Sequence, residues 1–403
     1  MSTTTRPAEA PASSRAIGLA GLLLGDHPVG RLGRAAAGSR LAAALATPHG
    51  VDRYLEIIDP MLAVAEVRAR VVSVVRENPD ADDSAPVATI TLQPTATWRG
   101  HRAGQYVQVG VDLPGSARRL TRCFSVSSAA SVPGETITLT IRAHEDRPGH
   151  PSVSRFLVED ARPGQVVHLS QAQGDFTLDQ SPATPTAIPL LFVTGGSGIT
   201  PAMSMLRTLL RDGYEQRAGR KVTFVHYARS AEDQIFAAEL AQIAATDNDV
   251  DVHLRHGDHV FSEFELRRLV PDFRRTDTWA CGPAGLMELV TEAYDGSSAL
   301  RTEFFKVGTA TARSGTDAPA EGTVTFARDG RSAANTGASL LEQAEALGLR
   351  PEHGCRMGIC FSCTARKTEG TVRNVVTGEE SSLPDEDVRI CVSAPVGDCS
   401  VDL

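Results

Sequence analysis

Short runs of β-branched residues, separated by turn sequences, fill the chain from residue 64 to residue 180. The runs are AEVRARVVSVVREN, VATITLQPT, GQYVQVGVDL, TRCFSVSSA, ETITLTIRAH and GQVVHLSQA. Apolar and polar positions partly alternate within them, and stretches such as NPDADD and RPGH break them. Strands at this spacing predict an all-β barrel or sandwich, interrupted by one helix over residues 152–164.

The pattern of predicted secondary structure changes after a proline-rich segment at residues 180–189. Apolar strands now alternate with helical segments, in the order LLFVTGGSGITPAMSMLRTLLRDG, KVTFVHYARSAEDQIFAAELAQIAA, VDVHLRHG and TWACGPAGLMELVTEAYDG. Strands that alternate with helices in this way predict a parallel α/β sheet.

The two ends of the chain carry different patterns. Before residue 64, SRLAAALATP and VDRYLEIIDPML have helical spacing and close near prolines. After a Gly/Ala/Thr-rich stretch come a hairpin pattern, GTVTFARDGRSAAN, and a helical pattern, ASLLEQAEALGL. The predicted segments are a helical extension (1–63), a β-barrel domain (64–180), an α/β domain (187–307), a linker (308–321) and a C-terminal domain (322–403).

Composition and charge narrow the class of protein. The net charge of −9 comes with no basic block, which argues against nucleic acid as the main partner. The apolar stretch at residues 16–25 has about half the length needed to span a bilayer. We do not interpret it as a signal peptide, because no clean cleavage site follows and the seven cysteines are clustered. We therefore expect a cytoplasmic protein with at most peripheral membrane contact.

The loop PEHGCRMGICFSC at residues 351–363 concentrates three cysteines. Cys355, Cys360 and Cys363, with Cys391 further along, have the C-x4-C-x2-C…C spacing of plant-type 2Fe-2S ligation. A zinc site, a disulfide pair or unligated core cysteines are the alternatives, and zinc loops usually carry paired C-x2-C motifs. We predict a 2Fe-2S cluster on these four ligands. Cys123 and Cys399 lie outside the pattern and are expected to be small buried side chains.

Two glycine turns end strands of the predicted α/β domain. Both turns would lie at the carboxyl edge of one parallel sheet, where ligands bind, and amides at the helix N-terminus after the first turn suit a pyrophosphate. Either signal alone is weak, because glycine turns are common at strand ends. The residues are Gly195, Gly196, Gly198, Thr200 and Pro201 in the first turn, and Cys281, Gly282 and Pro283 in the second.

The barrel contributes RCFSVSS, which alone would pass for an ordinary strand. Arg122 can neutralise a phosphate, Phe124 can offer a flat face, and Ser125 can donate a hydrogen bond to a heterocycle.

Together these segments resemble the ferredoxin–NADP⁺ reductase superfamily, in the subset with a C-terminal plant-type 2Fe-2S ferredoxin domain. R-x-F-S, G-G-x-G-I-T-P, C-G-P and the cysteine pattern occur in that order over residues 64–403. The resemblance implies a multidomain fold: an antiparallel β-barrel flavin domain, an α/β parallel-sheet nucleotide domain and an α+β β-grasp ferredoxin domain. It also implies an NAD(P)H oxidoreductase with FAD, a 2Fe-2S cluster and NADPH or NADH.

The resemblance assigns roles to particular residues. Arg122 would meet the flavin phosphate, Phe124 and Ser125 the isoalloxazine, and Ser154 the flavin pyrophosphate. Phe124 replaces the family's usual tyrosine, so stacking is kept and the phenol's hydrogen bond is lost. The two glycine turns would hold the nicotinamide nucleotide, with Cys281 near the reacting ring, so Ser125 and Cys281 are the predicted catalytic residues.

The coenzyme preference depends on the sequence HYARSAED. Arginine at the end of the second α/β strand can pair with a 2′-phosphate, whereas an acidic residue there favours the free ribose hydroxyl. Arg229 and Ser230 favour NADPH. An alternative is that both are exposed turn residues.

Further resemblance concerns the electron acceptor. The segments YLEIIDPMLAVAEVRARV, WRGHRAGQYVQVGVD and GCRMGICFSC resemble actinobacterial oxidoreductases that supply electrons to membrane-bound acyl-CoA Δ9 desaturases. The implied function passes electrons from NAD(P)H through FAD and 2Fe-2S to a stearoyl-CoA desaturase. The alternatives are the reductase of a ring-hydroxylating or other oxygenase, and a redox-sensing carrier without turnover.

Overall fold

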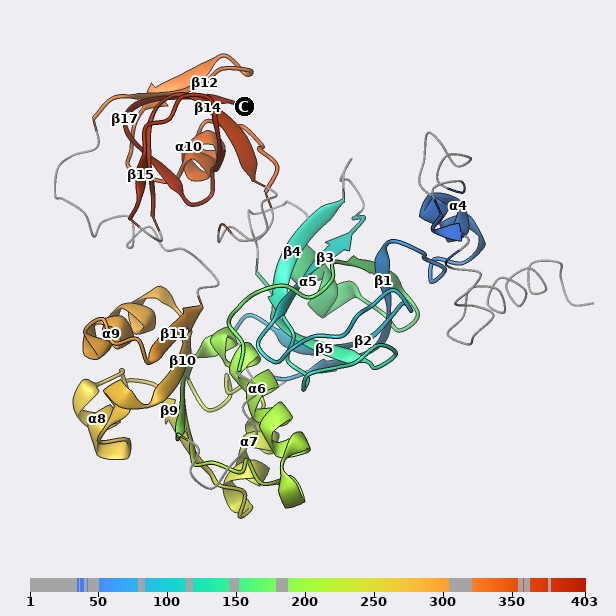
Figure 1. Ribbon diagram of the computed structural model, residues 1–403, viewed down its shortest axis with the longest axis vertical. Coiled ribbons are helices and arrows are strands. Elements are labelled where there is room, and N and C mark those ends of the chain that lie inside the picture. Colours follow the sequence, from blue (N-terminus) through green and yellow to red (C-terminus); the bar gives the residue numbers. More distant parts are fainter. Residues whose placement is uncertain are drawn as a thin grey trace, which may run out of the picture.

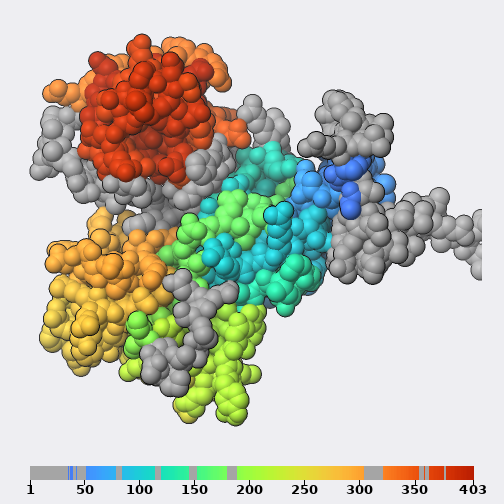
Figure 2. All heavy atoms as spheres, in the orientation of Figure 1, coloured from blue at the N-terminus to red at the C-terminus, as the bar shows by residue number. Residues whose placement is uncertain are grey.

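Three sheets organise the described part of the chain. The computed structural model describes residues 35, 37–39, 42, 51–78, 84–113, 119–144, 152–178, 188–303, 321–353, 358, 363–375 and 378–403. Figure 1 shows the sheets in three separate bodies, with the C-terminal body, in orange and red, apart from the other two. Figure 2 shows the same bodies with all atoms drawn.

The first body is an antiparallel barrel, as the strand pattern predicts. Its strand order is β4-β3-β6-β1-β2-β5, and a bridge between Val126 and Leu139 joins the two ends of that order. Alternate residues of paired strands point inward, so Val71, Ile90 and Leu92 are almost fully buried. The strands are β1 (Val67–Arg76), β2 (Val87–Pro94), β3 (Tyr106–Val111), β4 (Leu120–Ser125), β5 (Ile137–Arg142) and β6 (Val166–Leu169).

The helix expected within the barrel is present in two parts. It begins as α5 (Val153–Arg155), capped by the Ser152 side chain, and continues as a π-helical stretch over Phe156–Asp160. Leu157 and Val158 pack into the barrel core.

The second body is a parallel sheet of order β11-β10-β7-β8-β9, as predicted. Its centre, β7 (Leu190–Gly195), is buried at every position, as expected for a parallel strand covered on both faces. The other strands are β8 (Val222–Ala228), β9 (Val250–His256), β10 (Asp277–Cys281) and β11 (Leu300–Glu303). The helices are α6 (Ile199–Asp212), α7 (Ala237–Ala245), α8 (Glu263–Leu269) and α9 (Ala284–Tyr294), with 3₁₀ turns at Gly196–Gly198, Tyr214–Gln216 and Phe273–Arg275.

Helix α6 fastens this sheet to the barrel. The Ser204 hydroxyl donates to the Ser128 carbonyl at 2.6 Å, and the Arg207 guanidinium donates to the Ser127 carbonyl at 2.5 Å. These bonds fix the carboxyl edge of the parallel sheet relative to β4 of the barrel.

The third body has the β-grasp arrangement, a mixed sheet packed on one helix. Ser339 and Glu342 form a capping box that begins α10 (Leu340–Ala346). Lys367 is fully buried, and its ammonium donates to the carbonyls of Gly370, Ser381 and Leu383. The strands are β12 (Thr323–Phe326), β13 (Arg331–Ala334), β14 (Thr364–Asn374), β15 (Glu380–Ser381), β16 (Glu386–Arg389) and β17 (Ser393–Asp402).

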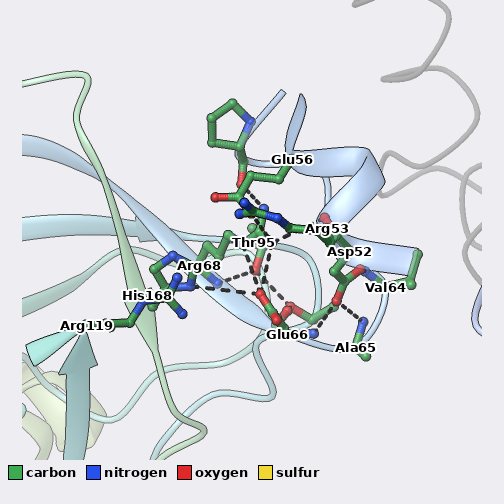
Figure 3. Close-up of polar contacts among 12 residues, drawn as sticks. Asp52, Arg53, Glu56, Val64, Ala65, Glu66, Arg68, Thr95, Arg119 and His168 are labelled. Atoms are coloured by element: carbon green, nitrogen blue, oxygen red, sulfur yellow. Dashed lines mark hydrogen bonds and ion pairs between the residues drawn. The ribbon is translucent and has the colours of Figure 1, made fainter. Parts of the chain in front are cut away.

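A buried carboxylate ties the N-terminal helix α4 (Val51–Ile58) to the barrel. Asp52 is 4% exposed and accepts hydrogen bonds from the amides of Val64, Ala65 and Glu66 at 2.7 to 3.0 Å (Figure 3). The guanidinium of Arg68, on β1, donates to the Asp52 carbonyl at 3.3 Å. The helix predicted near residue 55 is therefore present and anchored, whereas that at residues 39–48 lies largely outside the described residues.

Every helix among the described residues is too short or too polar to traverse a bilayer. The predicted linker falls almost entirely outside the described ranges, and the predicted domain boundaries stay predictions.

Candidate functional site

Three parallel strands end together at the carboxyl edge of the second body. In register, Cys281 of β10 pairs with Thr194 of β7 on one side and with Glu303 of β11 on the other. The chain leaves β7 and β10 here through the two glycine turns, and this edge of a parallel sheet is where ligands bind.

The two glycine turns pack against each other at this edge. A Cβ atom added to Gly198 would lie 2.3 Å from the Cys281 carbonyl oxygen, and one added to Gly282 would lie 3.1 Å from the Gly195 nitrogen. Any larger residue would push the turns apart. Gly196 has a φ of +53° with open space beside it, so the first turn presents bare backbone.

Helix α6 starts directly after the first turn. It is 14 residues long and no side chain caps its N-terminus, so its first amides can bind an anion. Thr200 and Pro201 are buried in the first helical turn, and the Thr200 hydroxyl donates to the Ser197 carbonyl at 3.0 Å. These two residues therefore shape the turn from within.

Strand β4 brings the barrel's predicted residues to the same junction. Arg122 and Phe124 are half-buried, whereas Ser125 is 6% exposed. The Ser125 hydroxyl has no hydrogen-bond partner among the described residues. Because an unsatisfied buried hydroxyl is costly, this group suits a polar atom of a bound heterocycle.

Glu303 and Cys281 complete the junction opposite Ser125. Burial raises the pKa of Glu303 to about 8. The Ser125 hydroxyl lies close enough to the carboxyl to offset part of this rise, although the two groups are not in hydrogen-bonding geometry. Burial, helped by the Glu303 carboxylate, raises the pKa of the Cys281 thiol. Oε2 of Glu303 is buried and makes no hydrogen bond within the described chain. The carboxyl of Glu303 therefore lies beside an unsatisfied hydroxyl, with the Cys281 thiol next to it in the sheet, and both acids are neutral over much of the physiological range.

The sequence pattern did not indicate Glu303. The only signal is an acidic residue at the end of the last strand, in LRTEFF, and strand ends often carry exposed acids. What distinguishes Glu303 is the register of β11, which places it beside Cys281.

Ser154 is 8% exposed, and its hydroxyl interacts with neighbouring residues of the chain. Its hydroxyl accepts from the His144 amide at 3.1 Å and lies 3.1 Å from the Ser152 hydroxyl. It fixes the start of α5 beside the barrel.

Arg229 and Ser230 follow β8 at the same carboxyl edge. Nε of Arg229 lies 2.9 Å from Oδ2 of Asp233, and Nη2 donates to the Ser84 hydroxyl at 3.0 Å. Asp233 is 4% exposed and also pairs with Arg142 of β5. The Ser230 hydroxyl accepts from the Asp233 amide at 3.3 Å. Arg229 is thus oriented by a buried acid, while its side chain stays 67% exposed.

Two of the four predicted cluster ligands lie within the described residues. Sγ of Cys363 and Sγ of Cys391 are 3.1 Å apart, both cysteines are buried, and neither forms a disulfide. The Gly358 amide donates to Sγ of Cys391 at 3.2 Å, as amides do toward cluster sulfur. Two close thiols with an amide donor fit an iron–sulfur cluster. Cys355 and Cys360 lie outside the described residues.

The two remaining cysteines considered in the sequence differ from each other. Cys399 is 3% exposed, as predicted, and burial raises its pKa to about 11. Cys123 is half-buried on β4, so the expectation of a fully buried side chain is wrong there. The reason is that β4 leaves five of its six positions only half-buried.

Comparisons with known proteins agree with this architecture. Residues 192–292 match the oxidoreductase NAD-binding domain family, and residues 324–396 match the 2Fe-2S iron-sulfur cluster binding domain family. A Mycobacterium tuberculosis protein named NADPH oxidoreductase is 37% identical, over 90% of this chain and 91% of its own length. The glycine betaine monooxygenase reductase subunit of Pseudomonas aeruginosa is 28% identical, over 75% of this chain and 87% of its own.

A solved structure shares the fold. Phthalate dioxygenase reductase, described as a modular structure for electron transfer from pyridine nucleotides to [2Fe-2S], superposes with a TM-score of 0.53 at 22% identity. The match covers 83% of this chain and 97% of that structure. The chain is thus an enzyme with FAD and a 2Fe-2S cluster as cofactors, and it belongs to the NAD(P)H oxidoreductases that join a ferredoxin reductase unit to a C-terminal 2Fe-2S domain.

Proposed function

We propose that the residues at the domain junction hold the flavin and the nicotinamide nucleotide, and that the cysteine loop holds the cluster. Arg122, Phe124, Ser125 and Ser154 form the flavin site, and Cys355, Cys360, Cys363 and Cys391 ligate the iron. The nucleotide lies on Gly195, Gly196, Gly198, Thr200, Pro201, Cys281, Gly282 and Pro283.

The observation that carries this proposal is the convergence of Ser125, Cys281 and Glu303 from two different domains. Arg122, Phe124, Ser125 and Ser154 would hold the flavin, and the bound flavin would supply the conversion of a two-electron hydride donor into single electrons for the cluster. Ser125 donates to the flavin ring, and Cys281 and Glu303 exclude water and orient the nicotinamide. Because the pKa of Glu303 is about 8, its carboxyl is mostly protonated at neutral pH and adds no charge beside the hydride.

For the coenzyme we infer a preference for NADPH. Arg229 is oriented by Asp233 and is mostly exposed, so it is available to a 2′-phosphate. The similarity to a protein named NADPH oxidoreductase supports this preference. NADH remains the alternative coenzyme, and paired kinetic constants for NADPH and NADH test the choice.

For the acceptor we propose a membrane-bound stearoyl-CoA Δ9 desaturase, reached from the cytoplasm by peripheral contact. Support comes from the sequence resemblance to desaturase reductases, which includes YLEIIDPMLAVAEVRARV. The test is reconstitution of stearoyl-CoA desaturation with a membrane desaturase from the same source, with NADPH and this protein as the reductant. Desaturation that needs this protein supports the partner, and its absence with an active desaturase contradicts it.

A second candidate acceptor is a soluble oxygenase. The similarity to a glycine betaine monooxygenase reductase subunit favours it. Substrate hydroxylation by such an oxygenase, driven by this protein and NADPH, would select this candidate over the desaturase.

An acidic face on the C-terminal domain offers a docking surface for either acceptor. Residues 321–403 contain 13 acidic and 8 basic residues. Glu379, Glu380, Asp385 and Asp387 are exposed and lie within four positions of Leu383 in the sequence, which is 66% exposed. A basic patch on the acceptor would complement this face. Neutralising Asp385, Glu386 and Asp387 together should abolish the salt dependence of electron delivery.

A further inference from the structure

A hydrogen bond links the flavin domain to the loop that leads into the cysteine segment. Nη2 of Arg122, on β4, lies 3.4 Å from Nε2 of His353, which is 231 residues further along the chain. His353 is only 18% exposed. Figure 1 shows β4 on the side of the barrel that faces the C-terminal domain.

The neighbours of His353 fix which ring nitrogen accepts. Nδ1 of His353 lies 3.0 Å from the Pro351 carbonyl oxygen, and a carbonyl can only accept. Nδ1 therefore donates to this carbonyl, which leaves Nε2 to accept from the guanidinium of Arg122. Arginine is always a donor, so the Arg122 contact is chemically matched.

Each partner is placed where the contact matters for electron transfer. Arg122 is the residue we assign to the flavin phosphate, and His353 precedes the predicted ligand Cys355 by two positions. Because a guanidinium has five N–H donors, binding His353 does not prevent it from binding phosphate. The same side chain can therefore serve both the flavin and the cluster domain.

We propose that His353 docks the 2Fe-2S domain on the flavin domain through Arg122, so that flavin binding stabilises the docked arrangement. This inference rests on the proposed flavin role of Arg122. A flavin phosphate that orders the Arg122 side chain reduces the conformational entropy lost when the Arg122–His353 contact forms. Because such coupling is reciprocal, docking in turn strengthens flavin binding.

Docking matters because a Gly/Ala/Thr-rich segment joins the C-terminal domain to the rest of the chain. Domains joined by such a segment move relative to each other unless contacts hold them. The step that benefits is transfer of one electron from the reduced flavin to the oxidised cluster. His353 itself carries neither the electron nor a proton, so it is a positioning residue.

The test compares five single variants of the full-length protein, among them Arg122→Ala, and the double variant Arg122→Lys/His353→Ala. His353→Ala removes the acceptor, and His353→Gln places an amide oxygen near the position of Nε2. Glu352→Gln is the matched control, because Glu352 is exposed in the same loop. Arg122→Lys keeps the positive charge that binds a phosphate but loses the planar guanidinium, whose several N–H donors can reach both the phosphate and His353. Small-angle X-ray scattering with and without FAD reports docking, and stopped-flow spectroscopy separates flavin reduction from cluster reduction.

The expected result is a loss of docking without a loss of hydride transfer. FAD should reduce the radius of gyration of the wild type, Glu352→Gln and His353→Gln, but not of His353→Ala. Cluster reduction should slow at least tenfold in His353→Ala, whereas flavin reduction stays within about threefold, and FAD affinity should fall because docking no longer strengthens flavin binding. Adding His353→Ala to Arg122→Lys should slow cluster reduction no further, because the two changes remove one contact.

Three outcomes overturn the inference. The first is that His353→Ala compacts with FAD and reduces its cluster as the wild type does. The second is that His353→Gln and His353→Ala show equal defects and both lose iron. The third is that the effects of Arg122→Lys and His353→Ala on the rate of cluster reduction add fully in the double variant. If Arg122→Lys and Arg122→Ala bind FAD as the wild type does, the proposed flavin role of Arg122 fails instead, and the docking measurements still decide the role of His353.

Discussion

Cys281 and Glu303 are register partners at the ends of β10 and β11, and Glu303 lies beside the buried Ser125 hydroxyl of the barrel. Residues from two domains therefore meet at one junction, which only the docked barrel and parallel sheet can create.

Replacing Ser125 by Ala should slow flavin reduction by about 10- to 100-fold, because one hydrogen bond to a buried ring is worth roughly 1–3 kcal/mol. FAD affinity should change little, since Arg122 still binds the phosphate. Stopped-flow reduction by NADPH measures the rate. Ser73→Ala, which removes a hydroxyl from β1 that bonds Thr91, is the control. Equal rates in both variants would exclude the proposed role of Ser125.

The raised pKa of Glu303 predicts a pH dependence of stability in the flavin-free protein. Glutamate titrates near 4.5 in the unfolded chain, whereas burial raises the pKa of folded Glu303 to about 8. Between these values the folded state binds the extra proton, so this group's contribution to the free energy of unfolding is full below pH 4.5 and falls as pH rises to 8. Urea denaturation at pH 5 and pH 8 should show a smaller fall for Glu303→Gln than for the wild type. A fall of the same size in both proteins would contradict the assignment.

Arg229→Ala should raise the KM for NADPH about 10- to 100-fold and leave that for NADH nearly unchanged, because a charge-assisted phosphate contact is worth roughly 1.5–3 kcal/mol. Asp233→Asn should produce a smaller change in the same direction, since Asp233 orients Arg229. Arg275→Ala, an exposed arginine in the same domain, should behave as the wild type. If the KM values for NADPH and NADH rose by the same factor, Arg229 would not be the residue that recognises the 2′-phosphate.

Asp52→Ala should lower the free energy of unfolding by about 3 kcal/mol, because three backbone amides lose a buried carboxylate acceptor. Arg53→Ala, which removes a 67% exposed partner of Glu56, should cost less than about 0.5 kcal/mol. Thermal and urea unfolding measure both. Similar losses in the two variants would mean that the Asp52 anchor contributes little.

The architecture could be predicted from the sequence because each sheet type leaves a local pattern. Alternating β-branched runs predicted the barrel, and GGSGITP and CGP marked two strand ends that the parallel register then brought into contact. Glu303 and His353 could not be predicted, because their importance arises from partners 22 and 231 residues away in sequence. Only the folded register and the docking of domains create those contacts.

The central claim is that one chain carries electrons from a nicotinamide nucleotide through a flavin site to a cluster held by Cys363 and Cys391. The most direct measurement compares ferricyanide and cytochrome c reduction by NADPH in the wild type and in Cys391→Ser, with the iron content and the electron paramagnetic resonance spectrum of each protein. We predict that Cys391→Ser loses the cluster signal and cytochrome c reduction but keeps ferricyanide reduction at the flavin. Unchanged cytochrome c reduction and an unchanged cluster signal in Cys391→Ser would contradict the account.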